Sequence, residues 1–240
     1  MGNNKRKEFK MPSNFALKYY VDIVFCVDAT GSMRPVLDEV KNGILHFHSD
    51  LANAMSAKGK TIDGLRVRVV AFRDYYADKA DAMLVTDFFE LPRQAEELSR
   101  CIASINPKGG GDDPEDSLEA LAYAIRSDWK TDKTMKGRQV IVLWTDAPPH
   151  EMGYAKESPY YPSGMPATLS ELSRWWGTGN SESYMDNRAK RLLLFVPDDP
   201  TWNLISKSWN NTIFFPSIAG QGLREYEYER IINSISNTIL

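Results

Sequence analysis

The sequence has little cysteine, no long apolar run and no excess of basic charge. Only Cys26 and Cys101 occur among the 240 residues. Two isolated thiols indicate packed, reduced side chains of a reducing compartment rather than a disulfide framework. No apolar stretch reaches the ~18 residues that a membrane span needs. The formal net charge is −3, which gives no attractive field for nucleic acid or anionic lipid. We therefore expect neither nucleic-acid nor membrane partners.

The first residues carry no recognisable targeting signal. MGNNKRKEFK lacks the apolar core of a secretory signal, and Arg6 stands where a myristoylation motif needs Ser or Thr. We predict an N-terminal extension over residues 1–18 and a cytoplasmic location.

Apolar strand-like runs alternate with helical periodicities along the rest of the chain. The predicted strands are 19–28, 65–75, 81–91, 138–146, 191–197 and 211–217. The predicted helices are one long helix over 37–51, a helix over 93–105, one that starts at Pro114 with Asp113 as its cap, a short one between the last two strands, and one over 228–239. This alternation predicts a single α/β, doubly wound (Rossmann-like) domain over 19–240. We expect a mostly parallel sheet, one antiparallel edge strand, and helices on both faces.

Residues 147–190 show little clear periodicity. The segment is long for a connection, so it is predicted to be a functional or partly mobile insertion. Trp175 and Trp176 within it fit a partner-binding patch and packing onto the body equally well.

Three loops rich in carboxylates and hydroxyls are expected at one edge of the sheet. They are DATGS (28–32), GGGDDPED (109–116) and TDAPPH (145–150). Ligands of an open α/β sheet gather outside the carboxyl ends of its strands. None of the loops contains a catalytic Lys, Cys or obvious Ser–His pair, so no catalytic residue is predicted. Oxygen donors instead suit Mg²⁺, with Mn²⁺ or Ca²⁺ as alternatives.

The DATGS loop has three competing interpretations: a metal site, a phosphate-binding turn and an ordinary helix cap. Asp28, Thr30 and Ser32 alternate across the turn, so their side chains can share one pocket. Gly31 is expected to permit the tight backbone. No Lys-Ser/Thr follows the glycines of the second loop, which excludes a Walker loop. DATGS also lacks the second acid of the phosphatase pattern D-x-D-x-T. Three concordant loops favour the metal site.

The three histidines are weak signals by themselves. His150 in the third loop can contact a ligand or support the loop. His46 and His48 fall on the first predicted helix and are expected to be surface or packing residues.

Together these stretches resemble the von Willebrand factor A (vWA) domain. VDIVFCVDATGSM (21–33) looks like the first motif, D-x-[ST]-x-S, of the family's metal-ion-dependent adhesion site (MIDAS). GGGDDPEDSLEAL and VIVLWTDAPPH resemble its second and third loops in the expected order, and the resemblance spans 19–240. The strongest match is to intracellular, bacterial-type members that carry GGGD-x-P-E and TDAPPH.

The resemblance implies a role for each matching residue. Thr30 and Ser32 would ligate the cation directly through their hydroxyls, and Asp28 and Asp146 would act mainly through bound waters. Asp112 falls where many members have threonine. Its extra charge is expected to hold the cation more firmly and to leave it a weaker acceptor for a partner's carboxylate.

Glu115 is also expected to approach the site, because its position resembles the acidic loop of integrin β subunits. It completes the predicted metal set of Asp28, Thr30, Ser32, Asp112, Glu115 and Asp146.

The first functional hypothesis is a non-enzymatic binding module that presents the cation to an acidic residue of a protein partner. Related domains are linked to α-kinases, or to kinases and phosphatases of bacterial stress-response or defence systems. This sequence has neither kinase motifs nor room for a kinase domain, so we expect any such enzyme to be a separate protein. The second hypothesis is a Mg²⁺-dependent phosphoester or nucleotide hydrolase that uses the same acids, with His150 as its proton shuttle. A scaffold with a decayed metal site is the third.

Overall fold

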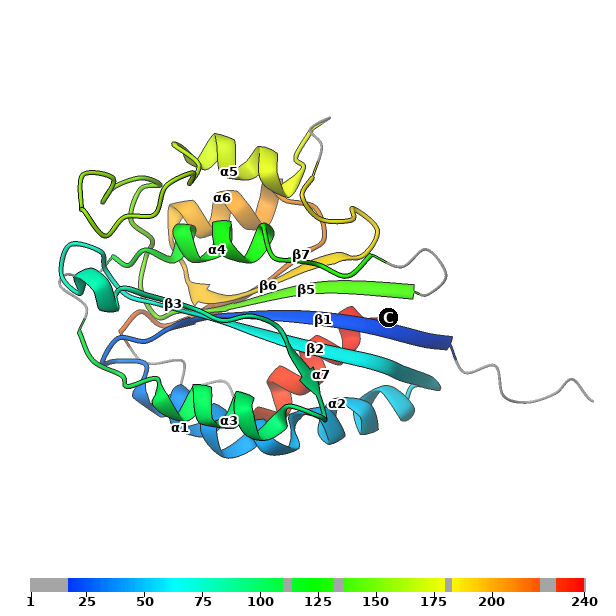
Figure 1. The fold of residues 1–240 in the computed structure, drawn as a ribbon. Coiled ribbons are helices and arrows are strands. Elements are labelled where there is room, and N and C mark those ends of the chain that lie inside the picture. The colour runs from blue at the N-terminus through cyan, green and yellow to red at the C-terminus, as the bar shows by residue number, and fades with distance from the viewer. Residues whose placement is uncertain (1–16, 110–113, 132–135, 180–182, 221–227, 240) are drawn as a thin grey trace, which may run out of the picture.

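The apolar run that ends in Asp28 forms the central strand of a seven-stranded sheet (Figure 1). The computed structural model describes residues 17–109, 114–131, 136–179, 183–220 and 228–239. Its strands are β1 (Leu17–Asp28), β2 (Lys60–Phe72), β3 (Met83–Val85), β4 (Phe89–Leu91), β5 (Lys136–Trp144), β6 (Lys190–Pro197) and β7 (Thr212–Ser217). Its α-helices are α1 (Arg34–Gly43), α2 (Phe47–Ser56), α3 (Ala95–Ser104), α4 (Ser117–Ile125), α5 (Leu169–Trp176), α6 (Pro200–Ser208) and α7 (Tyr228–Thr238), with 3-10 turns η1 (Ile44–His46) and η2 (Lys79–Asp81).

The strand order places the carboxyl ends of three strands at one edge. The path across the sheet is β3-β2-β1-β5-β6-β7, and β4 also pairs with β2. Strand β1 runs parallel to both neighbours, with Asp28 opposite Phe72 of β2 and Val27 opposite Trp144 of β5. The chain therefore leaves β1, β2 and β5 side by side, where the first and third loops were predicted to meet.

Helices cover both faces of the sheet and bury two apolar clusters. Helices α1, α2, α3 and α7 lie below the sheet and α4, α5 and α6 above it in Figure 1. Leu37, Phe47 and Ile235 belong to the lower cluster, and Leu121 and Trp202 belong to the upper one. Strands buried on both faces explain the nearly continuous apolar sequence of β1 and β5. The predicted α/β class is confirmed.

Two predicted elements are interrupted. The antiparallel strand expected over 81–91 is two short strands, β3 and β4, which pair with different parts of β2. The long helix expected over 37–51 is two helices separated by η1. At the end of α1, a side chain on Gly43 would meet the Tyr228 ring at 2.6 Å, so the close approach of α7 requires a glycine there.

The start of α4 was predicted wrongly. The helix begins at Ser117, and Pro114 lies before it. Asp116 does not cap the helix with its side chain; its Oδ2 instead accepts a hydrogen bond from the Tyr75 N–H at 2.6 Å. Asp113, the predicted cap, lies outside the described residues.

Among the described residues between β5 and β6, helix α5 is the one α-helix. Thr168 caps it by accepting the Glu171 N–H at 3.2 Å. Gly177 ends it with φ of +88°, the left-handed conformation that favours glycine at this position. The segment is thus ordered by local signals over at least this part.

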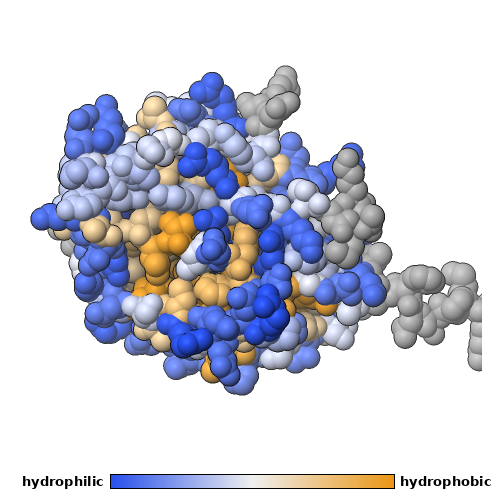
Figure 2. All heavy atoms as spheres, viewed as in Figure 1, coloured by the Kyte–Doolittle hydropathy of each residue, from blue (hydrophilic) through white to orange (hydrophobic). Residues whose placement is uncertain are grey.

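The sheet edge formed by β3 carries an exposed apolar patch. Figure 2 shows apolar side chains gathered in the middle of the viewed face, between the two helix layers. Leu84 of β3 is 39% exposed.

No helix within the described ranges is long and apolar enough to cross a membrane.

Candidate functional site

Asp28 ends β1 and is fully buried beneath the first loop. Its Oδ1 accepts hydrogen bonds from the Thr30 hydroxyl at 2.6 Å and the Thr30 N–H at 2.8 Å. Its Oδ2 accepts the Thr145 hydroxyl at 2.7 Å. Burial raises the pKa of Asp28 to about 6, although the hydrogen bonds from Thr30 and Thr145 lower it. The protein therefore fixes both oxygens of this carboxyl group.

A chain of polar contacts continues from Asp28 across the first loop to the third. The Thr30 and Ser32 hydroxyl oxygens lie 3.4 Å apart. Ser32 Oγ donates to Asp146 Oδ1 at 2.9 Å. Four of the six predicted metal residues are thereby brought together at the carboxyl ends of β1 and β5.

Thr145 was missed by the sequence analysis. Besides donating to Asp28, its hydroxyl accepts the Ala147 N–H at 3.1 Å. It therefore ties the third loop to the first. Its place at the end of the strand that neighbours β1, one residue before Asp146, was the available signal.

Glu115 reaches the same site from the segment before α4. Its main chain pairs with the third loop: Glu115 N–H donates to Pro148 O at 3.0 Å, and His150 N–H donates to Glu115 O at 2.9 Å. The side chain is only 3% exposed, and its Oε2 has no hydrogen-bond partner among the described residues. Burial first, and then the nearby acids led by Asp28, raise its pKa to about 10. The carboxyl group is therefore protonated at neutral pH unless a cation is present.

A cavity of about 510 Å³ opens over these groups. It is lined by Thr30, Gly31, Ser32, Gly109, Glu115, Asp146, Ala147, Pro148, Ala219 and Gly220. Gly109 leads into the second loop with φ of +78°, and a side chain there would lie 2.0 Å from Asp78 Oδ1. Only glycine fits this position. Asp112, further along that loop, lies outside the described residues.

The donor set fits a hard divalent cation. Two hydroxyls, the Asp146 carboxylate and the unpaired Glu115 Oε2 all border one cavity, and oxygen ligands of this kind are those that Mg²⁺ and Ca²⁺ use. Across the described part of the chain, no group of three or more His, Cys, Asp or Glu side chains is placed to hold a metal. The donors that line this cavity include the Thr30 and Ser32 hydroxyls, which are not His, Cys, Asp or Glu side chains.

Gly31 does not have the role expected of it. Its φ is not in the left-handed region, and an added side chain would meet nothing within 4 Å. The turn therefore does not require glycine at this position.

His150 supports the third loop and does not line the cavity. Its Nε2 lies 2.8 Å from Asp74 Oδ2, and its ring stacks on Tyr154 with centroids 4.0 Å apart. Asp74 Oδ1 in turn accepts the N–H groups of Tyr76 and Ala77. His46 is exposed and His48 partly buried at the helical surface, as expected.

Beside His150, exposed tyrosines form a rim that the sequence analysis did not identify. Tyr76 and Tyr154 are 46% and 48% exposed, and their rings meet edge to face at 5.3 Å. We call these two residues the tyrosine rim.

The paired tryptophans are packing residues. Trp176 is fully buried and stacks on Trp209 at 5.3 Å. Trp175 is partly buried, with the Arg126 guanidinium 4.7 Å from its ring centre. The 147–190 segment is thus fastened to the body by these rings, and the most exposed aromatic side chains of the described residues are tyrosines.

Comparisons with known proteins agree with this fold. Residues 23–148 match the model of the von Willebrand factor type A domain. The alpha-protein kinase vwkA of Dictyostelium discoideum is 30% identical over 146 residues, which cover 61% of this chain and 21% of that protein. A putative ariadne-like RING finger protein of Acanthamoeba polyphaga mimivirus is 23% identical over 140 residues, 58% of this chain and 12% of that protein. The chain therefore aligns with about a fifth or less of these relatives.

Among solved structures, the pilus adhesin SpaC of Lactobacillus rhamnosus GG has a similar fold. Its TM-score is 0.53 at 14% identity, over 92% of this chain and 30% of that one.

Proposed function

The chain belongs to the von Willebrand factor type A domain family, and from this premise we propose that it is a non-enzymatic, metal-dependent protein-interaction module. The cation would be Mg²⁺, with Mn²⁺ or Ca²⁺ as substitutes. Thr30 and Ser32 would hold it through their hydroxyls, Asp28 and Asp146 would act mainly through bound waters, and Asp112 and Glu115 would add negative charge. Bound there, a divalent cation supplies a Lewis-acidic position for the carboxylate of a partner.

The observation that carries this proposal is the buried, unpaired Oε2 of Glu115 beside the polar chain of the first and third loops. A buried carboxyl oxygen without a partner is costly. A cation in the cavity would relieve that cost and remove the proton that burial holds on Glu115. The protein's own part is to fix the donors in advance, as the hydrogen bonds to both Asp28 oxygens do.

The tyrosine rim extends the proposed contact surface. Half-exposed tyrosines are typical of interface anchors. His150 links the rim to the metal face, because it stacks on Tyr154 and its N–H binds Glu115 O. We propose that a partner with an acidic side chain on the cation packs its neighbouring residues against this rim.

The wider setting of the module is also a proposal. The kinase relative carries its similar segment within a longer chain, which supports a link between such modules and kinases. We propose that this chain is an intracellular, bacterial-type member that acts in the cytoplasm beside a separate kinase or phosphatase of a stress or defence system.

The hydrolase alternative gains no support from the position of His150. A proton shuttle must reach the reacting group, whereas His150 is buried against Asp74 and Tyr154 and does not line the cavity.

The test measures Mg²⁺ binding by calorimetry and thermal unfolding of the full chain, in Mg²⁺ and in EDTA. At 100-fold excess over Kd, binding stabilises the folded state by about 2.7 kcal/mol, or roughly 5–10 °C for a chain of this size. Ser32→Ala should abolish this shift. Ser49→Ala, at an exposed serine of α2 that donates to His46 O, is the matched control and should keep it.

Partner capture follows from the same proteins. Proteins retained from native lysate by wild type and Ser49→Ala, only in Mg²⁺, would support the module. Equal capture in EDTA would contradict metal dependence. Mg²⁺-dependent turnover of phosphoesters or nucleotides, lost in Asp112→Asn, would instead favour the hydrolase.

A further inference from the structure

Arg73, the first residue after β2, is buried where the loops of the candidate site meet. The residue is only 7% exposed. Its Nε donates to Ala29 O at 3.0 Å and to Lys108 O at 2.9 Å. Its Nη1 donates to Asp81 O at 2.6 Å and its Nη2 to Asn106 O at 2.8 Å. All of these acceptors are main-chain carbonyls, so the guanidinium fixes backbone positions rather than the charge of a site acid.

These contacts join the first loop to the start of the second. Ala29, between Asp28 and Thr30, accepts at its carbonyl both from Arg73 and from the Lys108 N–H at 3.1 Å. Lys108 directly precedes Gly109, which lines the cavity. The Nε of Arg73 therefore bridges the Ala29 carbonyl of the first loop and the Lys108 carbonyl that directly precedes the second loop.

The main chain of Arg73 holds a third segment. Its carbonyl accepts the Asp116 N–H at 3.2 Å, next to Glu115 with its unpaired Oε2. The same residue thus fixes the stem of the first loop, the stem of the second loop and the residue that follows Glu115.

Lysine cannot replace arginine in this arrangement. The guanidinium is a planar fork that can direct N–H groups to several fixed acceptors, whereas an ammonium is a compact point charge. A lysine would leave some of these buried carbonyls without a donor, and the loop spacing would relax to satisfy them.

We propose that Arg73 is a positioning residue of the metal site, which sets metal affinity by fixing the spacing of the first and second loops without touching the cation. The proposal rests on the proposed function, since it presupposes that the cavity binds a divalent cation. Partners that orient ligands from outside the coordination sphere typically change metal affinity by about 10–100-fold when they are replaced. We expect a weakening of that size for Mg²⁺ in Arg73→Lys.

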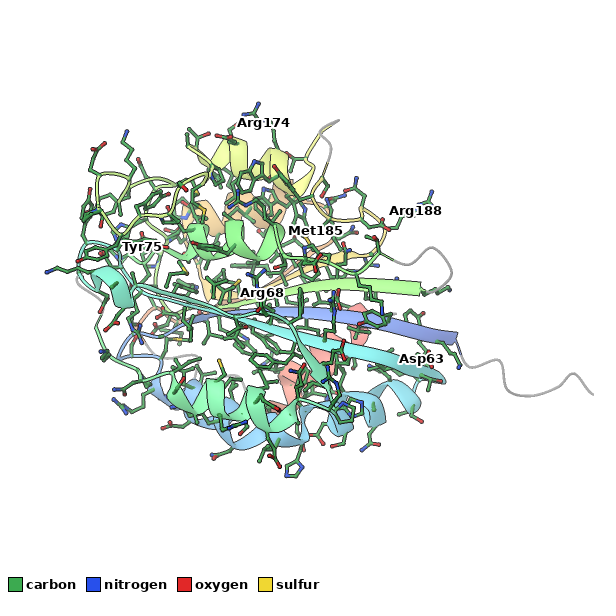
Figure 3. The ribbon with its side chains drawn as sticks, viewed as in Figure 1. Asp63, Arg68, Tyr75, Arg174, Met185 and Arg188 are labelled. Carbon is green, nitrogen blue, oxygen red and sulfur yellow. The ribbon has the colours of Figure 1, made fainter. Side chains whose placement is uncertain are left out.

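Arg68 provides the matched control. It lies on β2, is partly buried, and donates to Thr86 O at 2.7 Å and Ser127 Oγ at 2.8 Å. Figure 3 places Arg68 in the middle of the sheet, and Tyr75, two residues beyond Arg73, at the end where the loops gather. Arg68→Lys should lower the free energy of unfolding without altering the Kd for Mg²⁺.

The experiment measures Mg²⁺ Kd by calorimetry and the unfolding free energy for wild type, Arg73→Lys and Arg68→Lys. A weaker Kd in Arg73→Lys alone supports the proposal. Equal Kd values in all three proteins overturn it and leave the proposed function standing. Absence of Mg²⁺ binding to wild type overturns both.

Hydrogen exchange on the wild type keeps the proposal testable if Arg73→Lys does not fold. Loops held at a fixed spacing should respond together, so Mg²⁺ should slow exchange at the Lys108 N–H, which binds Ala29 O. Protection confined to the first and third loops, with Lys108 unchanged, would overturn the proposal.

Discussion

Glu119 of α4 fastens the 147–190 segment to the body, and its replacement should separate charge from hydrogen bonding. The residue is fully buried. Its Oε1 accepts the Gly153 N–H at 3.0 Å and the Tyr161 hydroxyl at 2.8 Å, and its Oε2 has no partner among the described residues. Burial raises its pKa above the ordinary value of 4.5, although both donors oppose the shift.

Two substitutions of Glu119 are expected to lower stability by very different amounts. Glu119→Ala leaves both donors unpaired and a cavity behind, and should cost about 3–5 kcal/mol of unfolding free energy. Glu119→Gln keeps a neutral acceptor of the same shape, so it should cost less than about 1 kcal/mol at pH 5. The raised pKa makes the contribution of Glu119 to the free energy of unfolding greatest below pH 4.5, and this contribution falls as pH rises through the folded-state pKa. The stability of Glu119→Gln relative to wild type should therefore increase from pH 5 to pH 8.

Urea unfolding at pH 5 and pH 8 measures these differences, and limited proteolysis over residues 150–165 reports local release of the segment. Glu119→Ala should be cleaved there faster than Glu119→Gln. If the two variants lose equal stability at pH 8, the carboxylate charge itself holds the segment, and the argument from hydrogen bonding is refuted.

Three further predictions concern stability. Asp22→Ala should cost about 3–5 kcal/mol in urea unfolding, because it leaves the Arg66 guanidinium without its buried carboxylate partner; a loss below 1 kcal/mol would contradict this. Gly177→Ala should lower Tm, whereas Gly31→Ala should not, since Gly177 combines positive φ with crowding and Gly31 has neither; equal Tm values would refute the contrast. Burial lowers the pKa of Lys190 from 10.5 to about 8, so its contribution to stability should be greatest above pH 10.5 and fall as pH drops through 8. The difference in unfolding free energy between wild type and Lys190→Met should follow that course, and a difference that does not change with pH would oppose it.

Patterns that depend on a single strand or turn were predictable from sequence. The spacing of Asp28, Thr30 and Ser32 placed three oxygen donors on one turn, and parallel strands predicted that Asp146 would join them. The structure brings these four together through side-chain contacts of Thr30 with Asp28 and Ser32, and of Ser32 with Asp146. Whether they hold a metal stays a prediction.

Features set by tertiary contacts were not predictable in this way. The acids before Ser117 indicated the start of a helix, because acidic side chains are favoured at helix N-termini. In the structure the main chain of Glu115 instead pairs with the third loop, and the Asp116 carboxylate accepts the Tyr75 N–H. Arg73 had no signal, since its role depends on carbonyls of distant loops. The expected 81–91 strand divides near Thr86, whose hydroxyl accepts the Val69 N–H and whose carbonyl accepts Arg68.

The acidic start of α4 connects the cavity of the candidate metal site to the tyrosine rim. Glu115 pairs with the third loop, Asp116 binds the loop after β2, and Glu119 binds the segment that follows His150. A partner that used both the cation and the rim would therefore contact two surfaces held by one helix end. Substitution of Glu119 should then weaken partner capture while leaving Mg²⁺ affinity unchanged, because Glu119 does not line the cavity. Substitution of Ser32 should reduce both.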